Sequence, residues 1–130
     1  MSRWERLMTS RMFGAAPVFT VADCATSSVH YRDVLGFTIN YDDGEYVTLS
    51  RGDTKIHLCL ASVLRIPAEL RRLPGQGSAY VFCDDVDALH EEFQARGARI
   101  QKPPQTYDYG MRDFNVLDLE GNQLVFGMSV

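Results

Sequence analysis

The segments 23-DCATSSVHYRDVLGFTI-39 and 85-DVDALHEEFQARGARI-100 follow one pattern, although few of their residues are identical. In each segment an Asp precedes a stretch that suits a helix of about three turns, and a Gly follows it. Asp is a favourable N-cap, and Gly readily takes the left-handed conformation that ends a helix. These positions are held by Asp23, Gly36, Asp85 and Gly97. The chain therefore contains two helices in equivalent settings.

Strand-like segments flank both helices. Short runs rich in β-branched and aromatic residues favour strands over 16–22, 37–41, 45–51 and 54–60 in the first half, and over 78–84, 98–100, 112–119 and 122–128 in the second. The dipeptide Asp43-Gly44 is a strong hairpin signal, and Gly residues precede the last strand of each half. Each half is thus predicted to be βαβββ. The expected fold is α+β, an internal duplication forming a curved mixed sheet with helices on its convex side.

The predicted domain organisation follows from this repeat. We expect an N-terminal arm, 1–13, and a single domain, 14–130, made of repeats 14–61 and 77–130 joined by the linker 62–76. The linker is rich in Pro and Gly, which favours an irregular connection with at most one short helical turn.

Composition limits the functions to consider. The chain has 130 residues, enough for one domain, and no apolar run near the roughly 20 residues that cross a bilayer. Its net charge of −4, with scattered Lys and Arg, disfavours nucleic acid as a partner. The three cysteines are widely spaced, which favours reduced thiols. With no secretory signal in the first residues, we expect a cytoplasmic protein that does not bind membranes.

Four motifs give the chain a family resemblance. YRDVLGF ends the first helix, GDTKIHL enters the fourth strand, DDVDAL begins the second helix, and YGMRDFNVLDLEGN precedes the last strand. Together with the duplication they resemble the vicinal oxygen chelate superfamily of glyoxalases, extradiol dioxygenases and bleomycin resistance proteins. Within it the sequence is most similar to the bleomycin resistance proteins, over about residues 15–128.

The resemblance implies where a metal would be held. Enzymes of the superfamily take His, Gln or Glu ligands from the first and last strand of each half. By spacing, three of these positions are Ala16, Ser78 and Val125, which are poor ligands for a divalent metal. The fourth is Ile56 or His57, depending on one residue of register. The resemblance therefore implies neither a metal nor another cofactor.

The position of His57 on its strand is compatible with several roles. It alternates with Lys55 and Cys59 on one face of its strand, opposite the apolar face that would pack on a helix, so it is expected on the concave face. There it suits a metal ligand, a general base or a hydrogen-bonding contact to a ligand, or it is a sheet residue without a special role.

The same resemblance points to aromatic contacts with a ligand. Bleomycin resistance proteins stack aromatic side chains on the planar rings of the drug, at positions that match Tyr46 and Tyr109. Tyr41, Tyr107 and Phe114 would extend this aromatic wall. A tyrosine offers a flat face and a hydroxyl at little entropic cost, which suits such contacts.

Charged residues leave the charge of the ligand open. Carboxylates lie near both aromatic positions and favour a cation, and they are Asp42, Asp43, Glu45, Asp108 and Asp113. The linker opposes a cation with Arg65, Arg71 and Arg72. Arg112 is expected to brace the sheet or to pair with an acid.

Function is predicted on this basis. The leading hypothesis is a non-catalytic homodimer that sequesters a planar, bleomycin-like antibiotic. Its ligand contacts would be Tyr46, Tyr109, His57, Tyr41, Asp113 and Phe114. In relatives two chains commonly close the cleft, sometimes by exchanging a terminal strand or arm, as residues 1–13 would allow. The alternatives are a metal-dependent glyoxalase- or dioxygenase-type enzyme built on His57, and a metabolite-binding paralogue with no role in resistance.

Overall fold

The computed structural model describes residues 1–63, 67 and 73–130. The arm holds α1 (Arg3–Leu7). The first half contains β1 (Val18–Val21), α2 (Cys24–Asp33), β2 (Thr38–Asp42), β3 (Tyr46–Arg51) and β4 (Thr54–Leu60). The second contains β5 (Ser78–Phe82), α3 (Val86–Ala95), β6 (Arg99–Thr106), β7 (Met111–Leu117) and β8 (Gln123–Ser129). The predicted helical turn of the linker and its arginines at 65, 71 and 72 fall outside the described residues.

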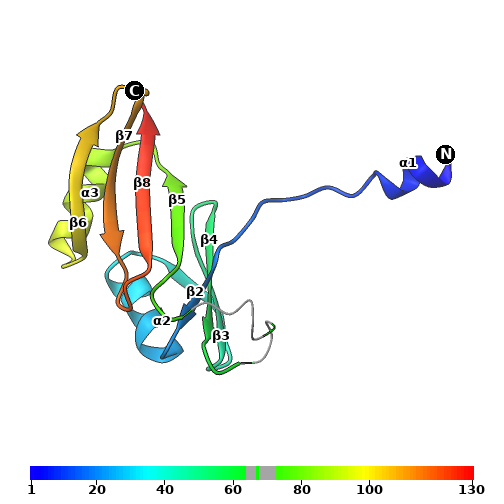
Figure 1. The fold of residues 1–130 in the computed structure, drawn as a ribbon, viewed down its shortest axis with the longest axis horizontal. Coiled ribbons are helices and arrows are strands. Elements are labelled where there is room, and N and C mark those ends of the chain that lie inside the picture. The colour runs from blue at the N-terminus through cyan, green and yellow to red at the C-terminus, as the bar shows by residue number, and fades with distance from the viewer. Residues whose placement is uncertain (64–66, 68–72) are drawn as a thin grey trace.

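Each half forms its own four-stranded mixed sheet (Figure 1). The strand orders are β1-β4-β3-β2 and β5-β8-β7-β6, so the two halves have the same topology. In each sheet the first strand pairs in parallel with the last, and the other pairs are antiparallel. The predicted α+β fold of two βαβββ repeats is confirmed.

The helix boundaries arise from the predicted local signals. The Asp23 carboxylate accepts hydrogen bonds from the Ala25 and Thr26 amides, and Asp85 accepts one from the Ala88 amide. Beyond the helix ends, Gly36 and Gly97 have φ angles of 73° and 82°, which residues with a Cβ rarely adopt. These four residues therefore fix where the two long helices begin and end.

Two elements differ from the sequence-based expectation. β6 extends to Thr106, well beyond the predicted 98–100, and includes Pro103 and Pro104. A proline cannot donate to a neighbouring strand, but β6 is an edge strand and its pairing with β7 is irregular, so the prolines are tolerated. The arm contains the short helix α1, which Ser2 caps through the Glu5 amide.

The core lies between the helices and one face of each sheet. The apolar side chains of both halves form one buried cluster that includes Phe19, Val21, Tyr31, Leu49, Ile56, Leu58, Phe93, Phe114, Val116, Leu124 and Phe126. Because side chains alternate along a strand, the other face of each sheet turns away from this cluster. Both remaining faces are available to ligands or partners.

We name these two surfaces by the residues that strand register brings together. The first open face consists of Val18, Thr20, Tyr46, Thr48, Ser50, Lys55, His57 and Cys59. The second open face consists of Ser78, Tyr80, Phe82, Met111, Asp113, Asn115, Gln123, Val125, Gly127 and Ser129.

Hydrogen bonds connect the two halves of the chain. Glu120, in the β7–β8 turn, accepts hydrogen bonds from the backbone of Ala22 and Asp23 and from the Ser27 hydroxyl at the start of α2. Asp118, in the same turn, accepts the buried Tyr31 hydroxyl at 2.8 Å. A carboxylate at a helix N-terminus satisfies free amides and opposes the helix dipole. The β7–β8 turn of the second half thus binds the start of the first long helix.

Within the described part of the chain, no hydrogen bond links the N-terminal arm to the body of the protein. None of the residues of α1 is buried, and Figure 1 shows the arm extending away from the body of the protein. Among the described residues no helix has the length and apolar character needed to cross a membrane.

Candidate functional site

The strand register shows which residue of the first half corresponds to Val125 of the second. His57 lies between Val18 of β1 and Thr48 of β3. In the second half Val125 lies between Tyr80 of β5 and Asn115 of β7 in the same arrangement. His57 is therefore the structural counterpart of Val125 and lies on the first open face, whereas its neighbour Ile56 is buried in the core.

His57 is held by a second predicted residue, Tyr46. The Tyr46 hydroxyl and His57 Nδ1 are 2.7 Å apart, and the two rings meet edge to face with centroids 5.4 Å apart. This contact fixes the orientation of the imidazole and leaves Nε2 as its other polar atom. Two of the predicted ligand contacts thus form one hydrogen-bonded unit on the first open face.

The donor set does not fit the metal of the superfamily's enzymes. Among the described residues no three His, Cys, Asp or Glu side chains gather closely enough to hold a metal ion. The counterparts of a metal ligand set include Val125, which has no donor atom, and the Nδ1 of His57 is already engaged by Tyr46.

The second open face contains a buried carboxylate. Asp113 is only 6% exposed, and its Oδ2 accepts the Tyr80 hydroxyl at 3.0 Å. Tyr80 reaches it by crossing β8 at Gly127, where a Cβ would overlap the phenol ring. Burial, and then the hydrogen bond to Asp113, raise the pKa of the Tyr80 phenol to about 12. The phenol is therefore a neutral donor at physiological pH.

An aromatic platform lies at the end of the same sheet. The rings of Tyr107 and Tyr109 stack with centroids 5.2 Å apart and planes inclined by 10°, and Tyr109 is 66% exposed. Lys102 Nζ donates to the Tyr107 hydroxyl at 3.0 Å and lies 5.5 Å from the centre of its ring. The platform can stack a planar ring.

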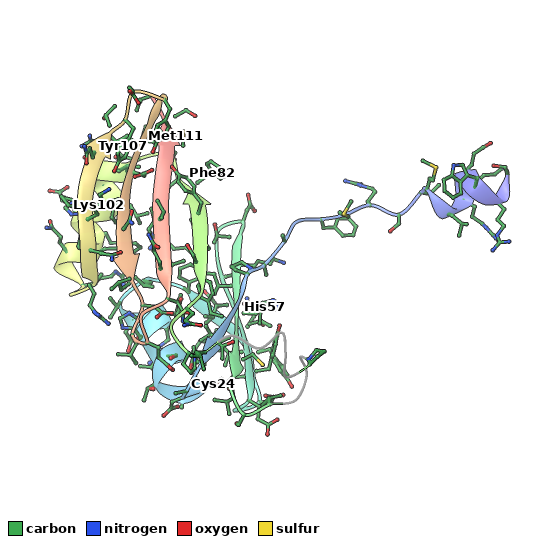
Figure 2. All side chains as sticks on the ribbon, viewed as in Figure 1. Cys24, His57, Phe82, Lys102, Tyr107 and Met111 are labelled. Atoms are coloured by element: carbon green, nitrogen blue, oxygen red, sulfur yellow. The ribbon has the colours of Figure 1, made fainter. Side chains whose placement is uncertain are left out.

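Asp113 is electrostatically linked to this platform. Partial desolvation, and next the charge of Asp113, raise the pKa of Tyr109. The Asp113 charge also contributes to the raised pKa of Lys102, whose largest cause is the hydrogen bond to Tyr107. Figure 2 shows Lys102, Tyr107 and Met111 gathered over the second sheet, far from His57 on the first. Four of the six predicted contacts therefore form two separate groups, Tyr46 with His57 and Asp113 with Tyr109.

Two predicted contacts lie elsewhere. Phe114 has no exposed surface and packs in the core, where its ring meets those of Phe93 and Phe126, so its expected place in a ligand wall is wrong. The reason is alternation along β7, since Asp113 on the open face sends its neighbour to the other side. Tyr41 is exposed on the edge strand β2 and donates to Asp43 at 2.9 Å.

The sequence-based prediction missed Tyr80 and Gly127. Within 79–83 the residues of both faces are apolar or aromatic, so these five residues do not show which side meets the core. The useful signal lies in size, because the small Ala79 and Val81 are the residues that face the core and the bulky Tyr80 and Phe82 are exposed. Arg112 pairs with Asp87 at 2.7 Å, as expected of a bracing residue.

Comparisons with solved structures agree with this fold. A bleomycin-binding protein from Streptomyces verticillus, complexed with copper(II)-bleomycin, is 29% identical, with 91% of this chain and 97% of that chain covered and a TM-score of 0.70. A lactoylglutathione lyase from Agrobacterium tumefaciens is 22% identical, with 92% and 93% covered and a TM-score of 0.70. The second likeness shows the fold alone.

A search of curated proteins gives no significant match. A family model, by contrast, matches most of the chain. It covers residues 15–126 and is described as the Glyoxalase/Bleomycin resistance protein/Dioxygenase superfamily. The matched range includes both repeats, and the chain belongs to this superfamily.

Proposed function

We propose that the protein binds a planar, bleomycin-like antibiotic and sequesters it without changing it chemically. The observation that carries this proposal is the second open face, where the buried carboxylate of Asp113 lies near the exposed Tyr107–Tyr109 stack. A stacking surface beside a carboxylate suits a flat ligand with a positive charge. The similarity to a structure described as a bleomycin-binding protein supports this choice of ligand.

Preorganisation supports binding at this surface. In the ligand-free protein the Tyr80 hydroxyl donates a hydrogen bond to Asp113, and Lys102 donates one to the Tyr107 hydroxyl. Side chains that are already ordered lose less conformational entropy when a ligand binds. Tyr46 and His57, joined on the first open face, form a second preorganised group.

We propose further that two copies of the chain assemble, each covering part of the other's open faces. The support is exposed apolar surface: Val18 on one open face, Tyr80 and Phe82 on the other, and several side chains of the arm. Phe82 is 76% exposed. Contiguous exposed apolar side chains mark interaction sites in soluble proteins.

Calorimetric titration with copper(II)-bleomycin and with metal-free bleomycin tests the function. We expect saturable binding by the wild type, and a loss of about tenfold or more in affinity for Tyr109→Ala and for Asp113→Asn. Glu91→Gln, an exposed change on α3, is the matched control and should leave affinity unchanged. Mass spectrometry of the recovered ligand should show an unaltered drug.

The alternatives predict different results. Unchanged affinity in both variants places the drug elsewhere, and no binding of either form contradicts capture of this antibiotic. Turnover of a hemithioacetal by the nickel- or zinc-loaded protein, lost in His57→Ala, indicates the enzyme. Binding of a metabolite in place of the drug indicates a paralogue with no role in resistance.

A further inference from the structure

The first open face carries a group of hydrogen-bond donors on two paired strands. Lys55 and His57 lie two residues apart on β4, and their partners across the ladder on β3 are Ser50 and Thr48. Cross-strand neighbours on one face have Cβ atoms about 5 Å apart, and residues i and i+2 of a strand lie about 7 Å apart. These four side chains, which we call the donor patch, are therefore close enough to contact one small ligand group.

His57 has a fixed orientation in this patch. The Tyr46 hydroxyl is 2.7 Å from its Nδ1, so Nε2 is directed away from Tyr46. When Nδ1 accepts from the phenol, the hydrogen of the neutral ring is on Nε2, and the charged ring has a hydrogen on both nitrogens. The Nε2 atoms of His30 and His90 are buried, whereas His57 is half-buried and its Nε2 has no hydrogen-bond partner in the described part of the chain. This atom is therefore a donor available to an acceptor from outside.

The other donors of the patch are also available. Among the described residues the Lys55 ammonium group has no ion-pair or hydrogen-bond partner, and neither has the Thr48 hydroxyl. The Ser50 hydroxyl accepts from the Asn40 side chain at 2.8 Å, which leaves its own hydrogen free to donate. Lys55 is exposed, and Thr48 and Ser50 are half-buried. A ligand can therefore reach one positive charge and three further donors.

The charge of the first open face differs from that of the whole chain. None of the eight residues that define this face is a carboxylate. Asp53, in the β3–β4 turn beyond the patch, is exposed and forms no ion pair with Lys55 in the described structure. The chain as a whole has a net charge of −4, which opposes general attraction of anions. The donor patch is thus a local positive site on an acidic protein, and it suits an anion.

We propose that the donor patch binds the phosphate group of a small organic phosphate. Lys55 supplies the charge, and His57 Nε2 and the hydroxyls of Thr48 and Ser50 supply hydrogen bonds. A phosphate monoester has three terminal oxygens and a charge of about −1.5 to −2, so it can accept from both strands at once. A carboxylate has two oxygens and one charge, and it satisfies fewer of these donors. The patch lies on the first sheet, where Figure 2 shows His57, and does not depend on the proposed capture of an antibiotic.

Nitrogen NMR of the histidine rings tests the proposal. Spectra of the full chain are recorded while inorganic phosphate is added at constant pH and ionic strength. We expect a saturable shift of the Nε2 resonance of His57 and none for His30 and His90, whose Nε2 atoms are buried. Glycerol 3-phosphate should bind at least as tightly as inorganic phosphate, and acetate about fivefold more weakly.

Variants of the patch test its residues by the same titration. Lys55→Met should weaken phosphate binding by about fivefold, because it removes the charge of the patch. Thr48→Val keeps the shape of the side chain and removes one neutral donor, so we expect a loss of about threefold. Arg32→Gln is the matched control for charge: it removes one positive charge from an exposed position of α2 and should bind phosphate as the wild type does.

Several results would overturn the proposal. They are a His57 resonance that does not respond to phosphate, equal affinity for acetate and phosphate, and binding of inorganic phosphate without binding of glycerol 3-phosphate. Equal losses in Lys55→Met and Arg32→Gln would overturn it as well, because binding would then follow the net charge of the protein and not the donor patch.

Discussion

At position 127 the absence of a side chain lets Tyr80 cross β8 and donate to Asp113. In Gly127→Ala we expect the phenol to be displaced, because the new methyl group would occupy its place. The Tyr80 pKa should then fall from about 12 toward its usual value of 10. Spectrophotometric titration of tyrosinate measures this change, and Tyr80→Phe identifies the residue that titrates. Ser129→Ala, at an exposed position of β8, is the control and should leave the titration unchanged.

The buried pair of Tyr31 and Asp118 makes a second prediction at this scale. Both side chains are almost fully buried, and the Asp118 carboxylate also accepts from the Glu120 and Asn122 amides and from the Asn122 side chain. Tyr31→Phe removes one of its donors and should lower the free energy of unfolding by about 1–3 kcal/mol. Urea denaturation measures the change. Tyr41→Phe, on an exposed tyrosine, should change the free energy by less than about 0.5 kcal/mol.

Contacts between individual residues show what could and could not be predicted from the sequence. The Asp caps and the Gly residues after each helix act through contacts within a few residues, so local pattern predicts them well. The partners Tyr46 and His57 lie on different strands, and only their register reveals the hydrogen bond. Asp113 and Phe114 were both expected in the site, but adjacent strand residues point to opposite faces.

At the scale of elements, β3 and α3 are joined by the ion pair between Arg51 and Glu92. The hydrogen bond from Arg51 is the largest cause of the lowered pKa of Glu92. Because the pKa of Glu92 is lower in the folded state, the pair stabilises the folded state fully at pH values above about 4.5, the usual pKa of a Glu. This stabilisation is lost as the pH falls through the lower pKa of the folded state. Wild type should therefore exceed Glu92→Gln in stability at neutral pH, and the difference should shrink in acid.

Denaturation of both proteins across a range of pH checks this expectation. Glu91→Gln, one residue away and exposed, is the control and should parallel the wild type at every pH. A difference between wild type and Glu92→Gln that stays constant down to strongly acidic pH would show that the ion pair is not its cause.

Elements also show why the strand prediction was incomplete. β6 contains Pro103 and Pro104, which ordinarily exclude a strand, and its true length becomes visible only once it is known to lie at a sheet edge. Position in the sheet is a property of the assembled fold. The strands β3 and β4, joined by a tight turn, were predicted almost to the residue because their signals are local.

At the scale of the whole molecule, the N-terminal arm extends away from the body of the protein (Figure 1). Its exposed apolar residues are Met1, Trp4, Leu7, Met8, Met12 and Phe13. Deletion of residues 1–13 should leave the thermal unfolding temperature of the single chain unchanged, since no residue of α1 is buried. If the arm binds a second copy, as the proposed assembly allows, the deletion should raise the dimer dissociation constant by about tenfold or more.

Sedimentation equilibrium and thermal denaturation, run on both proteins, separate these effects. The variant Trp4→Ala tests the same contact with a smaller change. An identical dissociation constant for the full chain and the shortened one would show that the arm plays no part in assembly.

The hydrogen bonds from the residues at the start of α2 to Glu120 have a consequence for how the protein is made. The amides of Ala22 and Asp23 donate to the Glu120 carboxylate, which lies 98 and 97 residues further along the chain, respectively. During synthesis the first half emerges from the ribosome long before residue 120 exists, so these two amides and the Ser27 hydroxyl lack their Glu120 partner until translation is almost finished. Contacts between such distant residues also slow folding. The two repeats, although alike in topology, therefore complete part of each other's hydrogen bonding only after both have been synthesised.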